Sequence, residues 1–220
     1  MKKYTVNHVP ANKLTITGKA DDPLWELADS LTDFNSPWCA LQGTKTEFRS
    51  LWDDANLYFM FKVVDSYIHI DNKGSGNESI NVSDRVELFF RQDDSLDPYY
   101  CLEIDPTPRI MDFQAFPKRV FDFDWNWPAN HLTVKSHSGT DGFTVEGKIS
   151  MASLEKLNLV HDHTIETGIF RAKYVKVDAS TYEPIWITWV NPETETPDFH
   201  IASSFGILIL GQEKSNVTDR

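Results

Sequence analysis

The chain has 220 residues, of which 40% are hydrophobic and 13% aromatic, and its formal net charge at pH 7 is −12. This length fits one β-domain or two small domains, and the apolar share is large enough to form a sizeable core. The negative charge disfavours nucleic acid and anionic membranes as partners and favours a neutral or cationic one.

The N-terminus and the cysteines bear on the cellular compartment. Met1–Val6 begins like a signal peptide, but Asn7 and His8 interrupt any apolar segment, so we expect no leader in the chain as given. No stretch approaches the length of a transmembrane helix. Cys39 and Cys101 lack the spacing of a metal or redox motif, and two unpaired thiols are favoured over a disulfide. The compartment stays open between the cytoplasm and, for a mature form, the periplasm or the exterior.

The N-terminal third predicts short strands and one helical turn. A β-prone piece lies at Leu14–Thr17, and Asp22 followed by Pro23 is typical of a capped helical turn. The segments Thr46–Trp52 and Leu57–Val64 then alternate and predict a hairpin.

The stretch from residue 83 to 90 carries the clearest pattern. Its alternation places one apolar set on one side of a strand, namely Val86, Leu88 and Phe90. The opposite side receives a carboxylate between two guanidiniums beside an aromatic ring, namely Arg85, Glu87, Phe89 and Arg91. This second set suits a polar, flat-sided ligand, and its alternative is an ordinary surface ion pair.

The rest of the chain predicts further strands, one helix at Ser150–Leu159 and an aromatic, acidic loop at Phe121–Pro128. The expected strands are Tyr99–Asp105, Arg109–Phe116, Leu132–His137, Phe143–Ile149, Ile165–Val177, Pro184–Val190 and Phe205–Leu210. In all, about ten short strands with turn signals between them predict an all-β fold, a single antiparallel β-sandwich with jelly-roll or immunoglobulin-like layers and one or two short helices. We expect residues 1–220 to form one domain, without linker or repeat.

Four pieces in a set order carry a family resemblance: Gly18–Trp25, Leu51–Tyr58, Asp84–Phe89 and Asp198–Leu208. Together they resemble a family 9 carbohydrate-binding module, a β-sandwich found attached to xylanases and, as separate chains, in polysaccharide-degrading bacteria. The resemblance spans nearly the whole chain. It implies a sandwich that binds a saccharide without cleaving it.

The resemblance also implies site residues. Members of this family hold a sugar ring between two Trp side chains and bind its hydroxyls with charged residues. The positions that match are Glu87, Arg109 and Trp189. The family also commonly binds structural calcium, for which this sequence indicates no ligand set.

The sequence departs from the family at the second Trp. The family has this Trp shortly before the motif that contains Glu87, where this chain has Ser79–Val82, and no Trp occurs between Trp52 and Trp125. The second ring is therefore missing or comes from elsewhere, with Trp125 and Trp127 as candidates.

The residue types agree with sugar binding. A sugar ring needs an aromatic plane for its C–H face and carboxylate or guanidinium groups for its hydroxyls, and Arg85, Glu87, Arg109 and Trp189 are of these types. Trp186 has the opposite strand parity to Trp189, so at most one of them faces the ligand, and Trp186 is expected in the core.

Several features have alternatives. The loop that holds Trp125 and Trp127 either faces the ligand or forms a lid over an open end of the sandwich. His200 is expected to satisfy a loop backbone group, and His161–His163 is read as a solvated turn and not as a metal site.

The sequence therefore predicts recognition of a mono- or oligosaccharide of the xylan or cellulose type, in polysaccharide catabolism. The alternative is a glycoside hydrolase acting through a pair of carboxyl groups chosen from Glu103, Asp122 and Asp124. We expect a monomer whose partner is a saccharide and not nucleic acid or membrane.

Overall fold

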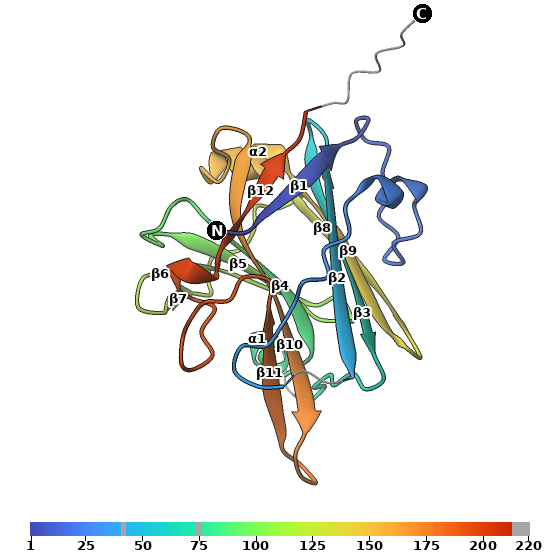
Figure 1. The fold of residues 1–220 in the computed structure, drawn as a ribbon, viewed down its shortest axis with the longest axis vertical. Helices are drawn as coiled ribbons and strands as arrows, with labels where there is room; N and C mark the ends of the chain where they lie inside the picture. Colours follow the sequence, from blue (N-terminus) through green and yellow to red (C-terminus); the bar gives the residue numbers. More distant parts are fainter. Residues whose placement is uncertain (41–42, 74–75, 213–220) are drawn as a thin grey trace, which may run out of the picture.

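The structure is a computed structural model that describes residues 1–40, 43–73 and 76–212. Within these residues the chain forms twelve strands, two short α-helices and two 3₁₀ turns (Figure 1). The strands are β1 (Lys3–His8), β2 (Thr44–Trp52), β3 (Asn56–Asp65), β4 (Arg85–Arg91), β5 (Tyr99–Ile104), β6 (Ile110–Phe116), β7 (Val120–Asp122), β8 (Leu132–Gly139), β9 (Gly142–Ser150), β10 (Thr164–Lys176), β11 (Tyr182–Thr188) and β12 (Gly206–Leu210). The helices are α1 (Asn77–Asn81) and α2 (Met151–Lys156), and the 3₁₀ turns are η1 (Pro23–Leu27) and η2 (Ala202–Ser204).

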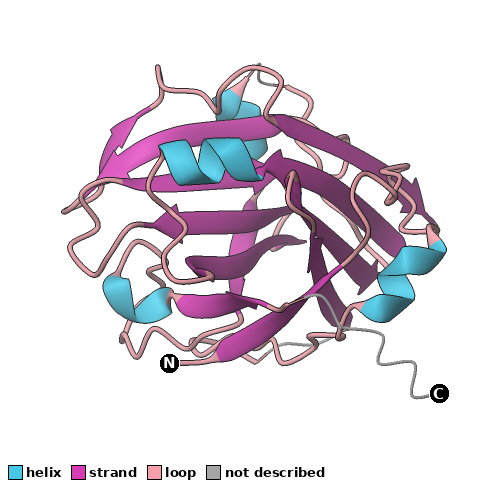
Figure 2. Ribbon diagram, turned by 90° about the horizontal axis from the view of Figure 1, so that it is seen from above, coloured by secondary structure: helices cyan, strands magenta, loops and turns pink. Residues whose placement is uncertain are grey.

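The strands form two sheets joined along β1. Sheet A has the order β7-β6-β5-β4-β10-β12-β1, with β11 also paired to β10, and sheet B has the order β1-β2-β3-β9-β8. The first part of β1 pairs with β12 and its end pairs with β2, both in parallel, while the remaining strand pairs are antiparallel. Seen from above, the strands run across the body and the short helices lie at its edges (Figure 2).

The main core lies between the two sheets and follows from the alternation of the strands. In β4 the inward residues are Val86, Leu88 and Phe90, and in β3 they include Phe59 and Phe61; each of them is at most 2% exposed. Side chains of one parity on facing strands thus bury each other, as the sequence pattern predicts.

Each sheet also carries apolar residues on its outer face. On sheet A the residues of the other parity gather around Phe89, Met111 and Phe113, and on sheet B around Tyr58 and Met60. Over each of these two outer clusters, the chain either packs a further segment or leaves a cavity.

The β-sandwich and the helix at residues 150–159 are confirmed, since α2 covers Met151–Lys156. Asp22 caps η1 through a hydrogen bond from the Leu24 backbone N–H, and Pro23 opens the turn. Three features differ from the sequence prediction. Leu14–Thr17 forms no strand, α1 was not predicted, and the predicted loop Phe121–Pro128 begins with two residues of β7. A single domain over residues 1–220 stays a prediction. Cys39 and Cys101 are both unpaired thiols. None of the helices in the described ranges has the length and apolar character needed to cross a membrane.

Candidate functional site

A cavity of about 580 Å³ opens on the outer face of sheet A. Its lining comes from four parts of the chain: α1, the central strands β4 to β6, the β7 hairpin and the segments around β11 and residue 198. The volume falls within the range of about 300–1,000 Å³ that small-molecule sites usually have. The lining residues are Asn77, Glu78, Asn81, Arg85, Glu87, Glu103, Met111, Phe113, Arg119, Phe121, Phe123, Trp186, Pro197, Asp198, Phe199 and His200.

The floor of the cavity is a row of charged side chains fixed by strand register. Glu87 in β4 lies directly opposite Glu103 in β5. The Nε atom of Arg85 lies 3.0 Å from Glu87 Oε1 and 2.5 Å from Glu103 Oε2. The guanidinium also donates through Nη1 to the Asn81 carbonyl at 2.9 Å, which ties the floor to α1. All three charged side chains are at most 4% exposed.

Glu87 and Glu103 are buried and share one guanidinium, and each holds a proton more firmly than an exposed carboxyl group does. Burial, and then the repulsion of Glu103, raises the pKa of Glu87 to about 8, although Arg85 opposes the shift. The pKa of Glu103 is also raised, because burial outweighs its contact with Arg85. Near neutral pH Glu87 therefore retains its proton beside Arg85.

One oxygen of this row has no hydrogen-bond partner. Glu87 Oε1 is buried and accepts no hydrogen bond within the described structure, although Arg85 is close enough to form an ion pair. A buried carboxyl oxygen without a donor costs free energy unless a ligand or water supplies one. Glu87 is thus open to a donor that comes from the cavity.

Aromatic rings stand on both sides of the floor. Trp186 on β11 is in register with Ala172 of β10, which is in turn in register with Arg85, so the three share one face of sheet A. The strand order places β7, with Phe121, on the other side of β4 and β5. Phe123 follows β7 and is 47% exposed. The cavity is therefore a polar floor between two aromatic sides.

The rim is held by an ion pair and a half-buried histidine. Arg119 donates to Asp198 at 2.8 Å, and His200 Nδ1 lies 2.9 Å from the Tyr99 hydroxyl. Burial, with Arg119 and Arg85 nearby, lowers the pKa of His200 to about 3. His200 is therefore neutral near pH 7 and packs against Phe121 with ring centroids 4.9 Å apart.

Comparisons with known proteins identify the family of the chain. The family model described as carbohydrate family 9 binding domain-like matches residues 16–213. The chain belongs to this carbohydrate-binding family.

Solved structures show the same fold at low sequence identity. A family 9 carbohydrate-binding module from Caldicellulosiruptor kristjanssonii, in complex with glucose, is 18% identical, with a TM-score of 0.66 over 99% of this chain and 100% of that one. A complex of such a module from the same organism with cellotriose gives 17% identity and a TM-score of 0.67 over 100% of this chain and 98% of that one. A putative carbohydrate-binding protein from Bacteroides uniformis gives 14% identity and a TM-score of 0.72, over 96% of this chain and 99% of that one. No curated protein sequence matches the chain.

The charged residues that the sequence indicated for sugar binding fall into two groups. Arg85 and Glu87 line the cavity. Arg109 lies outside the lining and contacts the Asp105 carboxylate at 2.6 Å and the Ser79 hydroxyl at 2.8 Å. Through its contact with Ser79, the Arg109 guanidinium thus stabilises α1, the helix that carries some of the lining residues.

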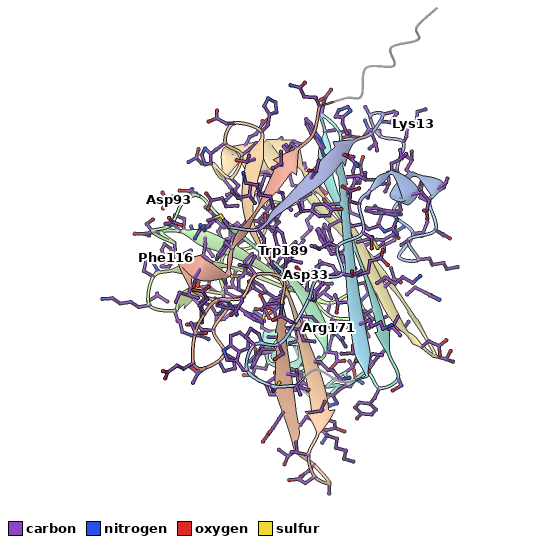
Figure 3. The ribbon with its side chains drawn as sticks, viewed as in Figure 1. Lys13, Asp33, Asp93, Phe116, Arg171 and Trp189 are labelled. Carbon is purple, nitrogen blue, oxygen red and sulfur yellow. The ribbon has the colours of Figure 1, made fainter. Side chains whose placement is uncertain are left out.

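The orientation expected for the two tryptophans of the β11 region is reversed. Trp189 is 1% exposed in the main core, and Figure 3 shows it in the middle of the molecule, whereas Trp186 lines the cavity. The reason lies partly in Gly206. A Cβ atom at Gly206 would lie 2.4 Å from the Trp189 ring, so the glycine makes room for that ring in the core.

The two tryptophans of the loop after β7 cover the core and do not line the cavity. Trp127 is 6% exposed, packs in the main core and donates to the Ser153 hydroxyl at 3.1 Å. Trp125 is half-buried, with its ring 5.0 Å from that of Tyr100. Neither lines the cavity, so the structure favours the lid over the ligand-facing loop for both residues.

The cavity residues that sequence reasoning missed include Phe121, Phe123, Asp198 and Trp186. The first two belong to a segment without strand periodicity, and only the high aromatic content signalled them. Asp198 lay in one of the four pieces of the resemblance but had no role assigned.

Metal sites find no support in the side-chain arrangement. Across residues 1–40, 43–73 and 76–212, no three His, Cys, Asp or Glu side chains are grouped so as to hold a metal ion. His161 contacts the Asn158 carbonyl through Nε2 at 2.9 Å in a turn, as expected of a solvated segment. Structural calcium stays a prediction.

Proposed function

We propose that the chain binds a mono- or oligosaccharide in the sheet A cavity without cleaving it. The observation that carries this proposal is Glu87. Its carboxyl group is buried on the floor of an aromatic-sided cavity, and its Oε1 atom accepts no hydrogen bond and lies 3.0 Å from the Arg85 guanidinium in an ion pair. A sugar hydroxyl supplies the missing donor.

The chemistry of the lining matches the two surfaces of a sugar ring. The apolar C–H face packs on an aromatic plane, for which Trp186 is the strongest candidate because it is the largest half-buried ring of the lining. The hydroxyls face Glu87, Glu103 and the side-chain amides of α1. Arg85 orients both carboxyl groups, and this fixes the acceptors before the ligand arrives.

In this proposal another aromatic side chain replaces the second sugar-binding Trp of the family. Phe121 and Phe123 stand across the floor from Trp186, on the β7 side of sheet A. Phe123 is 47% exposed although its ring contacts Phe113, at 4.9 Å between centroids. An exposed ring at a cavity rim suits contact with a ligand, so Phe123 takes the place of the second Trp.

The type of saccharide is inferred from the neighbours. The modules from Caldicellulosiruptor kristjanssonii are in complex with glucose and with cellotriose. We therefore propose a ligand of the cellulose or xylan type, bound in the course of polysaccharide catabolism. The cavity volume of about 580 Å³ is ample for one sugar ring.

Glycoside hydrolysis is the alternative. It requires two carboxyl groups that flank the bond to be cleaved. Of the three carboxyl groups considered for such a pair, Glu103 lines the cavity and Asp122 and Asp124 do not. Glu103 instead lies beside Glu87 on the neighbouring strand, and both contact the same nitrogen atom of Arg85. This arrangement supports a shared binding floor and not an acid and a nucleophile on opposite sides of a ring.

The test is titration of intrinsic tryptophan fluorescence with glucose, xylose, cellotriose and xylobiose. We expect a saturable change in the wild type and its loss in Trp186→Ala. The matched control is Trp52→Phe, because Trp52 is also half-buried but donates to the Gly211 carbonyl, outside the cavity lining. Absence of any saturable change with all four sugars would contradict the proposal.

A reducing-end assay separates binding from catalysis. The wild type is incubated with cellotriose and with xylan, and reducing ends are followed over time. We expect no increase above a protein-free sample. A time-dependent increase that disappears in Glu87→Gln would support the hydrolase instead.

A further inference from the structure

The cations of the cavity lining are already paired with carboxylates. Arg85 serves both Glu87 and Glu103 on the floor, and Arg119 donates to Asp198 at the rim. The residues that line the cavity include these two guanidiniums and no lysine. Among the lining residues that the structure describes, a ligand therefore meets no cation without a carboxylate partner.

The acidic groups exceed the basic ones. Besides the three paired carboxyl groups, the rim carries the exposed carboxylate of Glu78. The proton that the floor retains lowers the negative charge of its carboxyl groups but adds no free cation. The whole chain, with a formal net charge of −12, adds long-range repulsion of anions.

We propose that the cavity selects uncharged saccharides and rejects those that carry a carboxylate, such as uronic acids. This inference rests on the proposed saccharide binding. Neutral hydroxyl groups need only acceptors, which Glu87 and Glu103 supply. A ligand carboxylate has to give up its hydration without gaining an unpaired cation, which is costly on the buried floor. At the more exposed rim it has to compete with Asp198, which already holds Arg119.

Asp198 offers a direct way to change this balance. One of its oxygens, Oδ1, accepts from Arg119 at 2.8 Å and from the His200 backbone N–H at 2.9 Å. Asparagine has nearly the same shape and keeps an acceptor for the His200 N–H, but it removes the charge that neutralises Arg119. Asp198→Asn therefore turns Arg119 into a cation available to a ligand carboxylate.

The experiment compares the dissociation constants of glucose and glucuronate, two sugars that differ in one carboxylate, by isothermal titration calorimetry at pH 7. For the wild type we expect glucuronate to bind at least about tenfold more weakly than glucose. In Asp198→Asn we expect the ratio of the two constants to shrink severalfold. The matched control Glu155→Gln removes one negative charge on the exposed side of α2 and should leave the ratio within about twofold of the wild type.

The outcomes separate the two proposals. If none of glucose, xylose, cellotriose and xylobiose binds, saccharide binding itself is contradicted, and the selectivity with it. If the wild type binds glucuronate within about twofold of glucose, the selectivity is wrong while saccharide binding stands. A wide ratio that Asp198→Asn leaves unchanged would also overturn the inference, because the paired cations would then not be its cause.

Discussion

The outer faces of the two sheets each hold a buried glutamate beside a tryptophan, but the surroundings of the two carboxyl groups differ. On sheet B, Glu146 lies beside Trp25, whereas on sheet A, Glu87 shares its face with Trp186. Both carboxyl groups are at most 1% exposed. The difference between them lies in what satisfies their oxygens.

The protein itself fills the site on sheet B. Glu146 accepts hydrogen bonds from the Trp25 indole at 2.7 Å, from the Thr17 backbone N–H at 3.1 Å and from the Gly18 backbone N–H. Gly18 has a φ of +93°, and a Cβ there would lie 2.7 Å from the Ser136 carbonyl oxygen, so glycine is needed for this close approach. The N-terminal segment thus covers Glu146 and supplies the donors for its oxygens.

The site on sheet A has no such occupant. Glu87 Oε1 lacks a hydrogen-bond donor in the described structure, and the cavity above it is open. The comparison suggests a general criterion. A buried carboxylate whose acceptors are all used holds the fold together, and one with an unused acceptor beside a cavity is suited to a ligand.

The largest effect that should separate the two faces is on stability. Trp25→Ala removes a 2% exposed ring and one donor to Glu146, so we expect the free energy of unfolding to fall by about 3–5 kcal/mol. Saccharide affinity should stay near that of the wild type. Urea denaturation together with calorimetric titration of the folded protein measures both quantities. A loss of affinity at unchanged stability would reverse the roles given to the two faces.

Trp186→Ala should show the opposite pattern. Removing a half-buried ring from the cavity side is expected to weaken binding by about 1–3 kcal/mol, by analogy with the stacking of bases on aromatic side chains. The free energy of unfolding should change less than in Trp25→Ala. Equal losses of stability in the two variants would indicate that Trp186 serves only the fold.

Stability should depend on pH through Glu87. Because its pKa rises from 4.5 to about 8 on folding, the folded state binds a proton more firmly than the unfolded state between these values. The free energy of unfolding should therefore fall as pH increases across this window. Asp84, whose pKa burial raises to about 6, adds a change of the same sign at the lower end. Urea denaturation at several pH values should give the change in the free energy of unfolding per pH unit. Glu87→Gln should reduce this slope by about 1 kcal/mol per pH unit. An equal slope in both proteins would exclude a retained proton on Glu87.

The smallest effect is expected from the rim of the cavity. Phe123→Ala should weaken saccharide binding by about 0.5–1 kcal/mol, since an exposed ring contributes only part of its area. Val120→Ala is the control, because Val120 belongs to the same hairpin, is 58% exposed and lies outside the cavity lining. Calorimetric titration of both variants should show a change only for Phe123. Equal effects would assign the role to the hairpin as a whole.

Much of the fold followed from sequence patterns that are local. The alternation of β4 placed Glu87 and Arg85 on the face opposite to Val86 and Leu88, and the structure confirms this division. The cap at Asp22 was also readable, because capping depends on neighbours within three residues.

The parts that failed depend on contacts between distant segments. Trp186 and Trp189 were assigned opposite faces, but which face is inward depends on the register with β10 and on the space that Gly206 leaves. Phe123 lies in a segment without periodicity, so only the strand order of sheet A brings it near β4. The role of Arg109 as a support for α1 rests on a helix that the sequence did not predict.

The most direct test of the central claim compares Glu87→Gln with Glu146→Gln. Each variant replaces a buried carboxylate by an amide of similar shape, one at the open cavity and one at the filled site. Calorimetric titration with the tightest sugar of the fluorescence panel should show at least about tenfold weaker binding for Glu87→Gln and nearly wild-type binding for Glu146→Gln. Wild-type affinity in Glu87→Gln would contradict the assignment of the sheet A cavity as the saccharide site.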